Sequence, residues 1–177
     1  MNHAGEYGAI RIYEAQLRIA RRRAPELLDF LEHTLGDERR HRDIFEGLML
    51  KRRIRPCRTL SFWGLGGSLL GSVTGLLGRS AILGCTEAVE RTVHRHLEDQ
   101  LRWLGQRDPA VSEAIRAIQV EELEHLRFAE SGGDHPQRHW LRALDALIAG
   151  ATEALIWLST YGASSRLARQ IAPQPQR

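Results

Sequence analysis

Apolar residues recur at intervals of three and four along most of the chain, which is typical of helices that bury one face. The spacing predicts five helices, at residues 3–22, 25–50, 80–104, 109–130 and 137–161. Pro25 and Pro109 each fit the first turn of a helix, where the missing N–H leaves no hydrogen bond unmade. Asp108 is placed to cap the helix that Pro109 opens. The pattern predicts an all-α fold.

A run of 20 residues without a charge, Thr59 to Gly78, interrupts this pattern. It carries Gly67, Gly71 and Gly75 at intervals of four, a spacing that suits close helix packing. Directly upstream, residues 51–58 hold five positive charges. We expect the basic residues to meet anionic headgroups while the apolar segment enters the membrane interface. The alternative is a buried core segment that joins two pairs of helices.

Length and composition narrow the class of protein. A chain of 177 residues suits one domain, which we expect at residues 1–164, with a membrane-associating segment at 51–78 and a disordered tail at 165–177. The formal charge of +3 is too small to choose between an anionic membrane and RNA. Two cysteines without paired spacing argue against a disulfide framework, and neither a secretory nor an Arg-rich leader is visible. We therefore expect a bacterial cytoplasmic setting.

The chain matches itself when it is shifted by 84 positions. Over residues 1–48, 12 positions are identical to their counterparts, whereas chance gives about three or four. The identical positions include three pairs with metal-binding chemistry, Glu6/Glu90, Glu38/Glu122 and His41/His125. We interpret this as a duplication, in which two helical hairpins form a four-helix bundle and one further helix follows at the C-terminus.

Each half of the repeat contains Glu-x-x-His on its second helix. Residues three apart share a helix face, so the carboxylate and the imidazole can point at one ion. One such motif is weak evidence, because chance gives roughly 0.7 of them in this composition. The spacing of a second glutamate strengthens it, since Glu6 and Glu90 each lie 32 residues before the motif glutamate, with the predicted turn midway. Sixteen residues along each helix, about 24 Å, bring the two carboxylates to one level.

Four glutamates and two histidines therefore meet in one layer, which is the ligand set of di-iron and di-manganese bundles. The six expected ligands are Glu6, Glu38, His41, Glu90, Glu122 and His125. Four carboxylates offset the charge of two divalent cations in a buried site. In the alternative interpretation, all six residues are solvated and lie on helix surfaces. Asp37 and Glu121 each precede a motif glutamate, where an acidic residue commonly hydrogen-bonds the second nitrogen of a ligand histidine.

With these residues the chain resembles the demethoxyubiquinone hydroxylases of ubiquinone biosynthesis, membrane-associated members of the ferritin-like di-iron superfamily. Asn-His-Ala-Gly-Glu-Tyr-Gly-Ala at residues 2–9 is similar to the opening motif of that family. Further matches lie at residues 11–13, 45–49, 53–56, 85–90 and 121–125. The resemblance extends over about residues 2–160, and all six expected ligands fall on ligand positions of the family.

The resemblance implies a ferritin-like bundle with two iron ions that uses O2 to hydroxylate the benzoquinol ring of a polyprenylated demethoxyubiquinol. It implies a peripheral protein on the cytoplasmic face of the bacterial inner membrane, or of the mitochondrial inner membrane in a eukaryote. A lipid-binding partner in quinone biosynthesis is also implied. The Gly-rich run lacks Gly-x-Gly-x-x-Gly after a strand, so electrons come from a partner protein or from NADH without a Rossmann site.

Several residues near the expected ligands have two interpretations. His94 and His96 are candidates for proton or electron delivery, because relatives have a histidine near position 96 whereas helical spacing places His94 nearer the Glu90 face. Tyr13 is either a core residue or a hydrogen-bond donor to the site, and Glu87 is either a surface residue or an additional ligand. Leu97 stands where many relatives have tyrosine, which excludes a redox-active tyrosine at that position.

Two other functions suit the same ligands. A ferritin-like ferroxidase or iron-storage bundle uses them, but it leaves the apolar segment unexplained. A di-iron hydroxylase acting on tRNA is permitted by the sequence pI of about 9.3. RNA binding predicts basic and aromatic residues spread along a groove, whereas the basic residues here cluster beside apolar sequence. We therefore expect no nucleic-acid partner. Carboxylate and imidazole ligands suit iron and manganese alike.

Overall fold

The computed structural model describes residues 1–105, 107–132 and 139–171, and its regular secondary structure is helical throughout these ranges. The helices are α1 (Asn2–Arg23), a short 3-10 helix η1 (Pro25–Leu27), α2 (Leu28–Lys51), α3 (Leu60–Leu77), α4 (Arg79–Leu104), α5 (Pro109–Gly132), α6 (His139–Thr160) and α7 (Ala163–Ile171). The all-α prediction is confirmed for the described residues, and the helices of the four-helix bundle begin and end close to the predicted positions.

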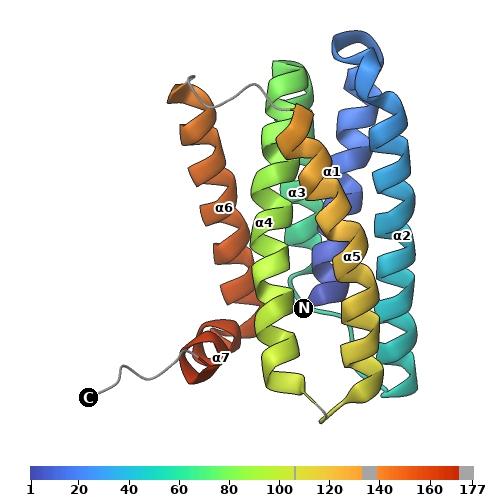
Figure 1. The fold of residues 1–177 in the computed structure, drawn as a ribbon, viewed down its shortest axis with the longest axis vertical. Helices are drawn as coiled ribbons and strands as arrows, with labels where there is room; N and C mark the ends of the chain where they lie inside the picture. Colours follow the sequence, from blue (N-terminus) through green and yellow to red (C-terminus); the bar gives the residue numbers. More distant parts are fainter. Residues whose placement is uncertain (106, 133–138, 172–177) are drawn as a thin grey trace.

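Two antiparallel pairs, α1 with α2 and α4 with α5, form the bundle (Figure 1). The first pair turns tightly through Pro25, which occupies the first turn of η1 as predicted. The second pair turns at Gly105, whose φ of +47° favours glycine, and the Asp108 carboxylate accepts a hydrogen bond of 3.2 Å from the Val111 amide. The predicted cap is confirmed. Descent of one pair from the other by duplication stays a prediction.

The bundle has apolar layers on both sides of its middle. Leu17, Leu31 and Ile82 belong to a buried cluster from α1, α2 and α4, whereas Phe45 and Ile115 belong to a cluster nearer the opposite ends of α2 and α5. On α2 and α5, the residues between these clusters include the two Glu-x-x-His motifs. The polar side chains of these motifs thus lie in a section of the core with apolar clusters on both sides along the helices.

Helix α3 is the segment that was predicted to enter the membrane interface. Its glycine face lies against α1 so closely that a Cβ at Gly67 or Gly71 would overlap the backbone carbonyl of Gly8 or Ile12. Its other face is open, with Phe62 61% and Leu76 57% exposed. Among the described helices, α3 is long and apolar enough to span a membrane, with one third of it buried. It is therefore not the fully buried core segment considered as the alternative.

Helices α6 and α7 complete the described chain. α6 packs on α4, on the far side of α4 from α2 (Figure 1). The predicted disordered tail is wrong for residues 165–171, because the chain turns at Gly162, with φ +73°, and continues as α7. α7 contacts both α4 and α6, and the Arg166 guanidinium donates a 3.0 Å hydrogen bond to the Tyr161 carbonyl. Residues 137, 138 and 172–177, included in the predictions, lie outside the described part of the chain.

Candidate metal centre

Six side chains from four helices meet at one level of the bundle. α1 contributes Glu6, α4 contributes Glu90, and the Glu-x-x-His motifs of α2 and α5 contribute the other four. All six are at most 5% exposed. They form two overlapping groups in which the ligand atoms lie within 4.8 Å of one another, Glu6/Glu38/His41/Glu122 and Glu38/Glu90/Glu122/His125. Glu38 and Glu122 belong to both groups, so each could contribute a ligand to either of two ions.

Five buried polar atoms of this cluster make no well-directed hydrogen bond within the described protein, although His41 Nδ1 lies 3.2 Å from Glu122 Oε1. The five atoms are both carboxylate oxygens of Glu38, one of Glu122, and Nδ1 of His41 and of His125. Buried polar atoms without partners are rare in folded proteins. Lone pairs that converge from carboxylates and imidazoles are what a divalent transition metal requires. The residues present therefore fit a pair of metal ions, and their role as ligands remains a proposal.

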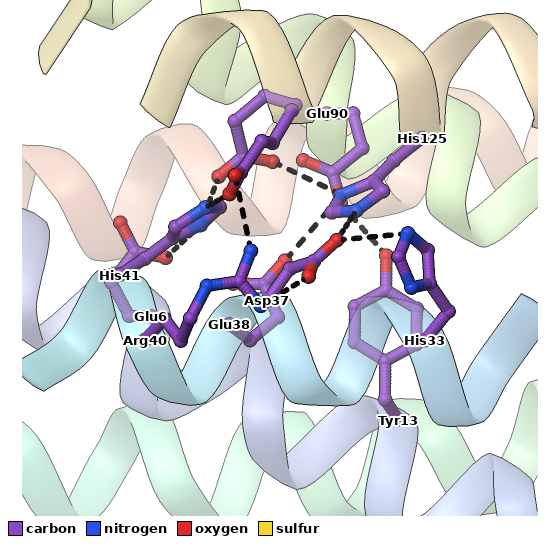
Figure 2. Close-up of polar contacts among 11 residues, drawn as sticks. Glu6, Tyr13, His33, Asp37, Glu38, Arg40, His41, Glu90 and His125 are labelled. Carbon is purple, nitrogen blue, oxygen red and sulfur yellow. Dashed lines mark hydrogen bonds and ion pairs between the residues drawn. The ribbon is translucent and has the colours of Figure 1, made fainter. Parts of the chain in front are cut away.

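The outward-facing histidine nitrogens are held by the two acidic residues that precede the motif glutamates. His125 Nε2 lies 2.9 Å from Asp37 Oδ2 (Figure 2), and His41 Nε2 lies 2.6 Å from Glu121 Oε2. Each acidic residue thus serves the histidine of the other helix. A carboxylate at Nε2 places the ring proton there and leaves Nδ1 free to bind a metal. The predicted hydrogen bonds are confirmed, and the crossing between α2 and α5 appears only in the structure.

Burial and mutual repulsion make the metal-free cluster hold protons. Burial, together with the charge of Glu122, raises the pKa of Glu6 to about 7, and burial raises the pKa of Glu38 and of Glu90 well above the usual range. Burial opposes a charge on His41, but hydrogen bonding and attraction to Glu122 outweigh it and raise its pKa to about 9. Burial likewise disfavours ionised Glu122, yet its close contacts with the imidazoles of His41 and His125 lower its pKa. Metal binding would displace these protons.

The contacts of Tyr13, Glu87 and His94 bear on the two interpretations that the sequence allowed for each residue. The Tyr13 hydroxyl donates a buried 2.7 Å hydrogen bond to Glu90 Oε1, so Tyr13 is both a core residue and a partner of the cluster. Glu87 accepts a 2.7 Å hydrogen bond from Arg91 at the surface and lies outside both ligand groups. His94 lies 3.7 Å from Glu98 on its own helix.

His96 occupies the wall of a cavity beside the cluster. The cavity, of about 410 Å³, lies among α1, α3, α4 and α6 and has almost entirely apolar walls. Four glutamates of the cluster are among its lining residues, namely Glu6, Glu38, Glu90 and Glu122. His96 lies on its wall and its Nε2 is 3.0 Å from Glu153 of α6, whereas His94 is not among the lining residues. Helical spacing favoured His94. The cavity depends on where α6 packs, and no pattern in the sequence indicated that packing.

The bundle and its cluster define a class of protein, the helical bundles with a buried carboxylate–histidine site that can hold metal ions. The family model for ubiquinone biosynthesis protein COQ7 matches residues 1–159. The chain therefore belongs to the COQ7 family, and the resemblance seen in the sequence is confirmed.

Several relatives are similar over most of the chain. It is 35% identical over 159 residues to the 3-demethoxyubiquinol 3-hydroxylase of Rhodospirillum rubrum, an overlap that covers 90% of this chain and 74% of the relative. It is 33% identical to the mitochondrial NADPH-dependent 3-demethoxyubiquinone 3-hydroxylase of Dictyostelium discoideum, with the same coverage. It is 34% identical to the mitochondrial 5-demethoxyubiquinone hydroxylase of Saccharomyces cerevisiae, over 73% of this chain and 62% of the relative.

Proposed function

We propose that the protein is an O2-dependent di-iron monooxygenase that hydroxylates the benzoquinol ring of a polyprenylated demethoxyubiquinol. The apolar cavity carries this proposal, because its lining residues include exposed apolar side chains of α3 and α6 as well as glutamates of the cluster. An iron-storage bundle has no use for such a cavity. The relatives are named as hydroxylases of this quinone and its quinol, which supports the same reaction.

The proposed ligands are Glu6, Glu38, His41, Glu90, Glu122 and His125, which would hold two iron ions. When bound, these ions supply the activation of O2. The remaining work belongs to the chain. The four carboxylates neutralise the ions in a buried site, and the apolar cavity walls exclude water and orient the ring toward the carboxylates by enclosing the prenyl tail.

We assign proton delivery at the ring to His96 rather than to His94. Glu153 holds His96 through Nε2 at 3.0 Å, and the imidazole faces the cavity that would contain the ring. A carboxylate partner of this kind fixes the orientation of an imidazole. We propose a reduced nicotinamide as the source of electrons, which the description of several relatives as NADPH-dependent supports.

The cavity entrance supports a position at the membrane surface. Leu69 of α3 and Leu147 of α6 line the cavity and are 65% and 69% exposed. The basic stretch at 51–58 directly precedes α3. A water-insoluble quinol would enter from the bilayer between these helices. We propose peripheral attachment to the cytoplasmic face of a bacterial inner membrane, while the eukaryotic relatives are named as mitochondrial.

The test is hydroxylation by the iron-loaded, chemically reduced protein, given O2 and a short-chain demethoxyubiquinol, with the product measured by mass spectrometry. Ala151 lines the cavity and is exposed at its α6 wall, so Ala151→Phe should narrow it and lower kcat/KM at least about tenfold. Ala154→Phe, exposed on the same helix but outside the cavity, is the control. No hydroxylated product despite two bound irons would overturn the assignment, and quinol-independent oxidation of excess Fe(II) would favour the ferroxidase.

A further inference from the structure

A single arginine joins the two carboxylate–histidine pairs on the outer side of the cluster. Arg40 Nη1 donates to Asp37 Oδ1 at 2.6 Å (Figure 2), and Arg40 Nη2 donates to Glu121 Oε1 at 3.0 Å. The other oxygen of each carboxylate contacts His125 or His41. Five side chains thus form an unbroken path from one histidine to the other, and no atom in the path is used twice.

The planar guanidinium suits this bridge because it presents two separate N–H groups in fixed directions. A lysine ammonium is a single point on a flexible stem and cannot hold both carboxylates in the same way. The neighbouring Arg39 takes no part, since its Nη2 donates to Glu14 Oε1 on α1. The bridge therefore depends on position 40, which lies one turn after Asp37 on the face of α2 toward α5.

Each part of the path affects how a histidine presents Nδ1 to the cluster. The Asp37 side chain is 4% exposed, and its carboxylate is held between the Arg40 guanidinium at 2.6 Å and His125 Nε2 at 2.9 Å. Glu121 is 38% exposed, so without Arg40 its side chain would be free to turn into solvent. His41 would then lose the contact that sets its orientation, and Asp37 would lose the donor that aligns its carboxylate with His125.

We propose that Arg40 is a positioning residue for both metal positions, since it holds His41 and His125 in register through Glu121 and Asp37. The proposal rests on the proposed metal site. Its consequence is specific: one substitution at an exposed arginine, which touches no ligand, weakens both positions together. A substitution of Glu121 alone weakens chiefly the position that His41 serves.

The experiment is a titration of the metal-free full-length protein with Co(II) alone, followed by calorimetry and by the visible absorption bands of bound Co(II). Arg40→Met should lower the affinity of both positions by about tenfold to a hundredfold and shift the bands, because the histidine geometry changes. Compared with Arg40→Met, Arg40→Lys should restore part of the Co(II) affinity of one position. Arg39→Met removes an arginine of similar exposure, 54% against 57%, and should behave as the wild type.

A double-substitution cycle separates positioning from a general effect on the fold. Glu121→Gln combined with Arg40→Met should lower affinity by less than the product of the single effects, because Arg40 acts at His41 through Glu121. Two Co(II) ions bound by Arg40→Met with wild-type affinity and spectrum would overturn the proposal while the metal site stands. Equal losses in Arg39→Met would also overturn it. Failure of the wild type to bind two ions would remove the metal site and this inference together.

Discussion

Glu121 and Glu122 are adjacent on α5 and have different tasks. Glu122 is 1% exposed and lies in both ligand groups, whereas Glu121 is 38% exposed and reaches His41 from outside. One step along a helix turns a side chain by about 100°, which is enough to exchange the core for the surface. Asp37 and Glu38 divide the same tasks on α2, although Asp37 is itself buried. At the scale of residues, direction from the helix axis decides the chemistry.

Tyr13→Phe tests a single contact to the cluster. The substitution keeps the buried ring and removes the hydroxyl that donates to Glu90 Oε1. A buried carboxylate oxygen without its donor should lower the free energy of unfolding of the metal-loaded protein by about 1–3 kcal/mol, measured by urea denaturation. Tyr7→Phe is the control, because the Tyr7 ring lies beside Gly64 of α3, away from Glu90. Equal losses in the two variants would contradict a specific role for Tyr13.

Helix α3 shows how one element combines two functions. Its glycine face permits close contact with α1, and the Gln16 side chain donates a buried 2.9 Å hydrogen bond to Thr74 across that contact. Its opposite face presents large apolar side chains to the outside, and its middle lines the cavity. Because α1 carries Glu6, the packing of α3 also supports the position of one cluster carboxylate.

Alanine substitutions at two glycines of α3 separate the effect of helix packing on stability from the effect of helix propensity. A Cβ at Gly71 would overlap the Ile12 carbonyl, so Gly71→Ala should lower the free energy of unfolding by about 1–3 kcal/mol. A Cβ at Gly66 would come only within 3.9 Å of Leu155, so Gly66→Ala should be neutral or stabilising by up to about 1 kcal/mol. Thermal unfolding of both variants provides the measurement. A tolerated Gly71→Ala would show that α3 does not depend on this contact.

The open face of α3 predicts binding to lipid vesicles. Leu76→Glu places a charge on that face and should weaken binding to anionic phospholipid vesicles at least about tenfold, because burial of one leucine contributes about 1.5–3 kcal/mol. Val120→Glu makes a comparable change at a similarly exposed site on α5, which lies outside the proposed membrane face. Vesicle flotation measures both variants. Equal binding by Leu76→Glu and the wild type would exclude α3 as the attachment surface.

For the molecule as a whole, metal and fold are linked through protons. The pKa of three cluster glutamates and of both histidines is raised above the ordinary value, so the folded metal-free protein binds these protons more tightly than the unfolded chain. Their contribution to stability is complete at low pH and is lost as pH rises through the folded-state values. The pKa of Glu122 is lowered, so its contribution to stability is present above its ordinary pKa and is lost only as pH falls below that value.

Metal removal should therefore make stability fall with rising pH. Between pH 5 and 9 the Tm of the metal-free protein should decrease, and the upward shift of the pKa of Glu6 to about 7 alone corresponds to about 3 kcal/mol. The gain in Tm on adding Mn(II) should grow over the same interval, because metal binding releases the protons. Scanning calorimetry with and without Mn(II) provides the measurement. A metal-free Tm that rises across this interval would contradict the proton-holding cluster.

The four bundle helices, their turns and the common level of six side chains followed from the sequence by itself, because helical periodicity and a turn midway between two glutamates are local properties. For the same reason, Asp37 and Glu121 were each expected to hydrogen-bond a histidine of the cluster. The chain from 165 to 171 was mispredicted, because α7 is stabilised by α4 and α6, which its own sequence does not reveal.

Tertiary structure decided which groups meet across helices. The crossing of Asp37 to His125, the bridge through Arg40 and the place of His96 on the cavity wall depend on how α2, α4, α5 and α6 rotate against one another. Periodicity gives the face of a helix but not the neighbour that it meets. The cavity exists only because α1, α3, α4 and α6 leave space between apolar faces, and that space is a property of their packing alone.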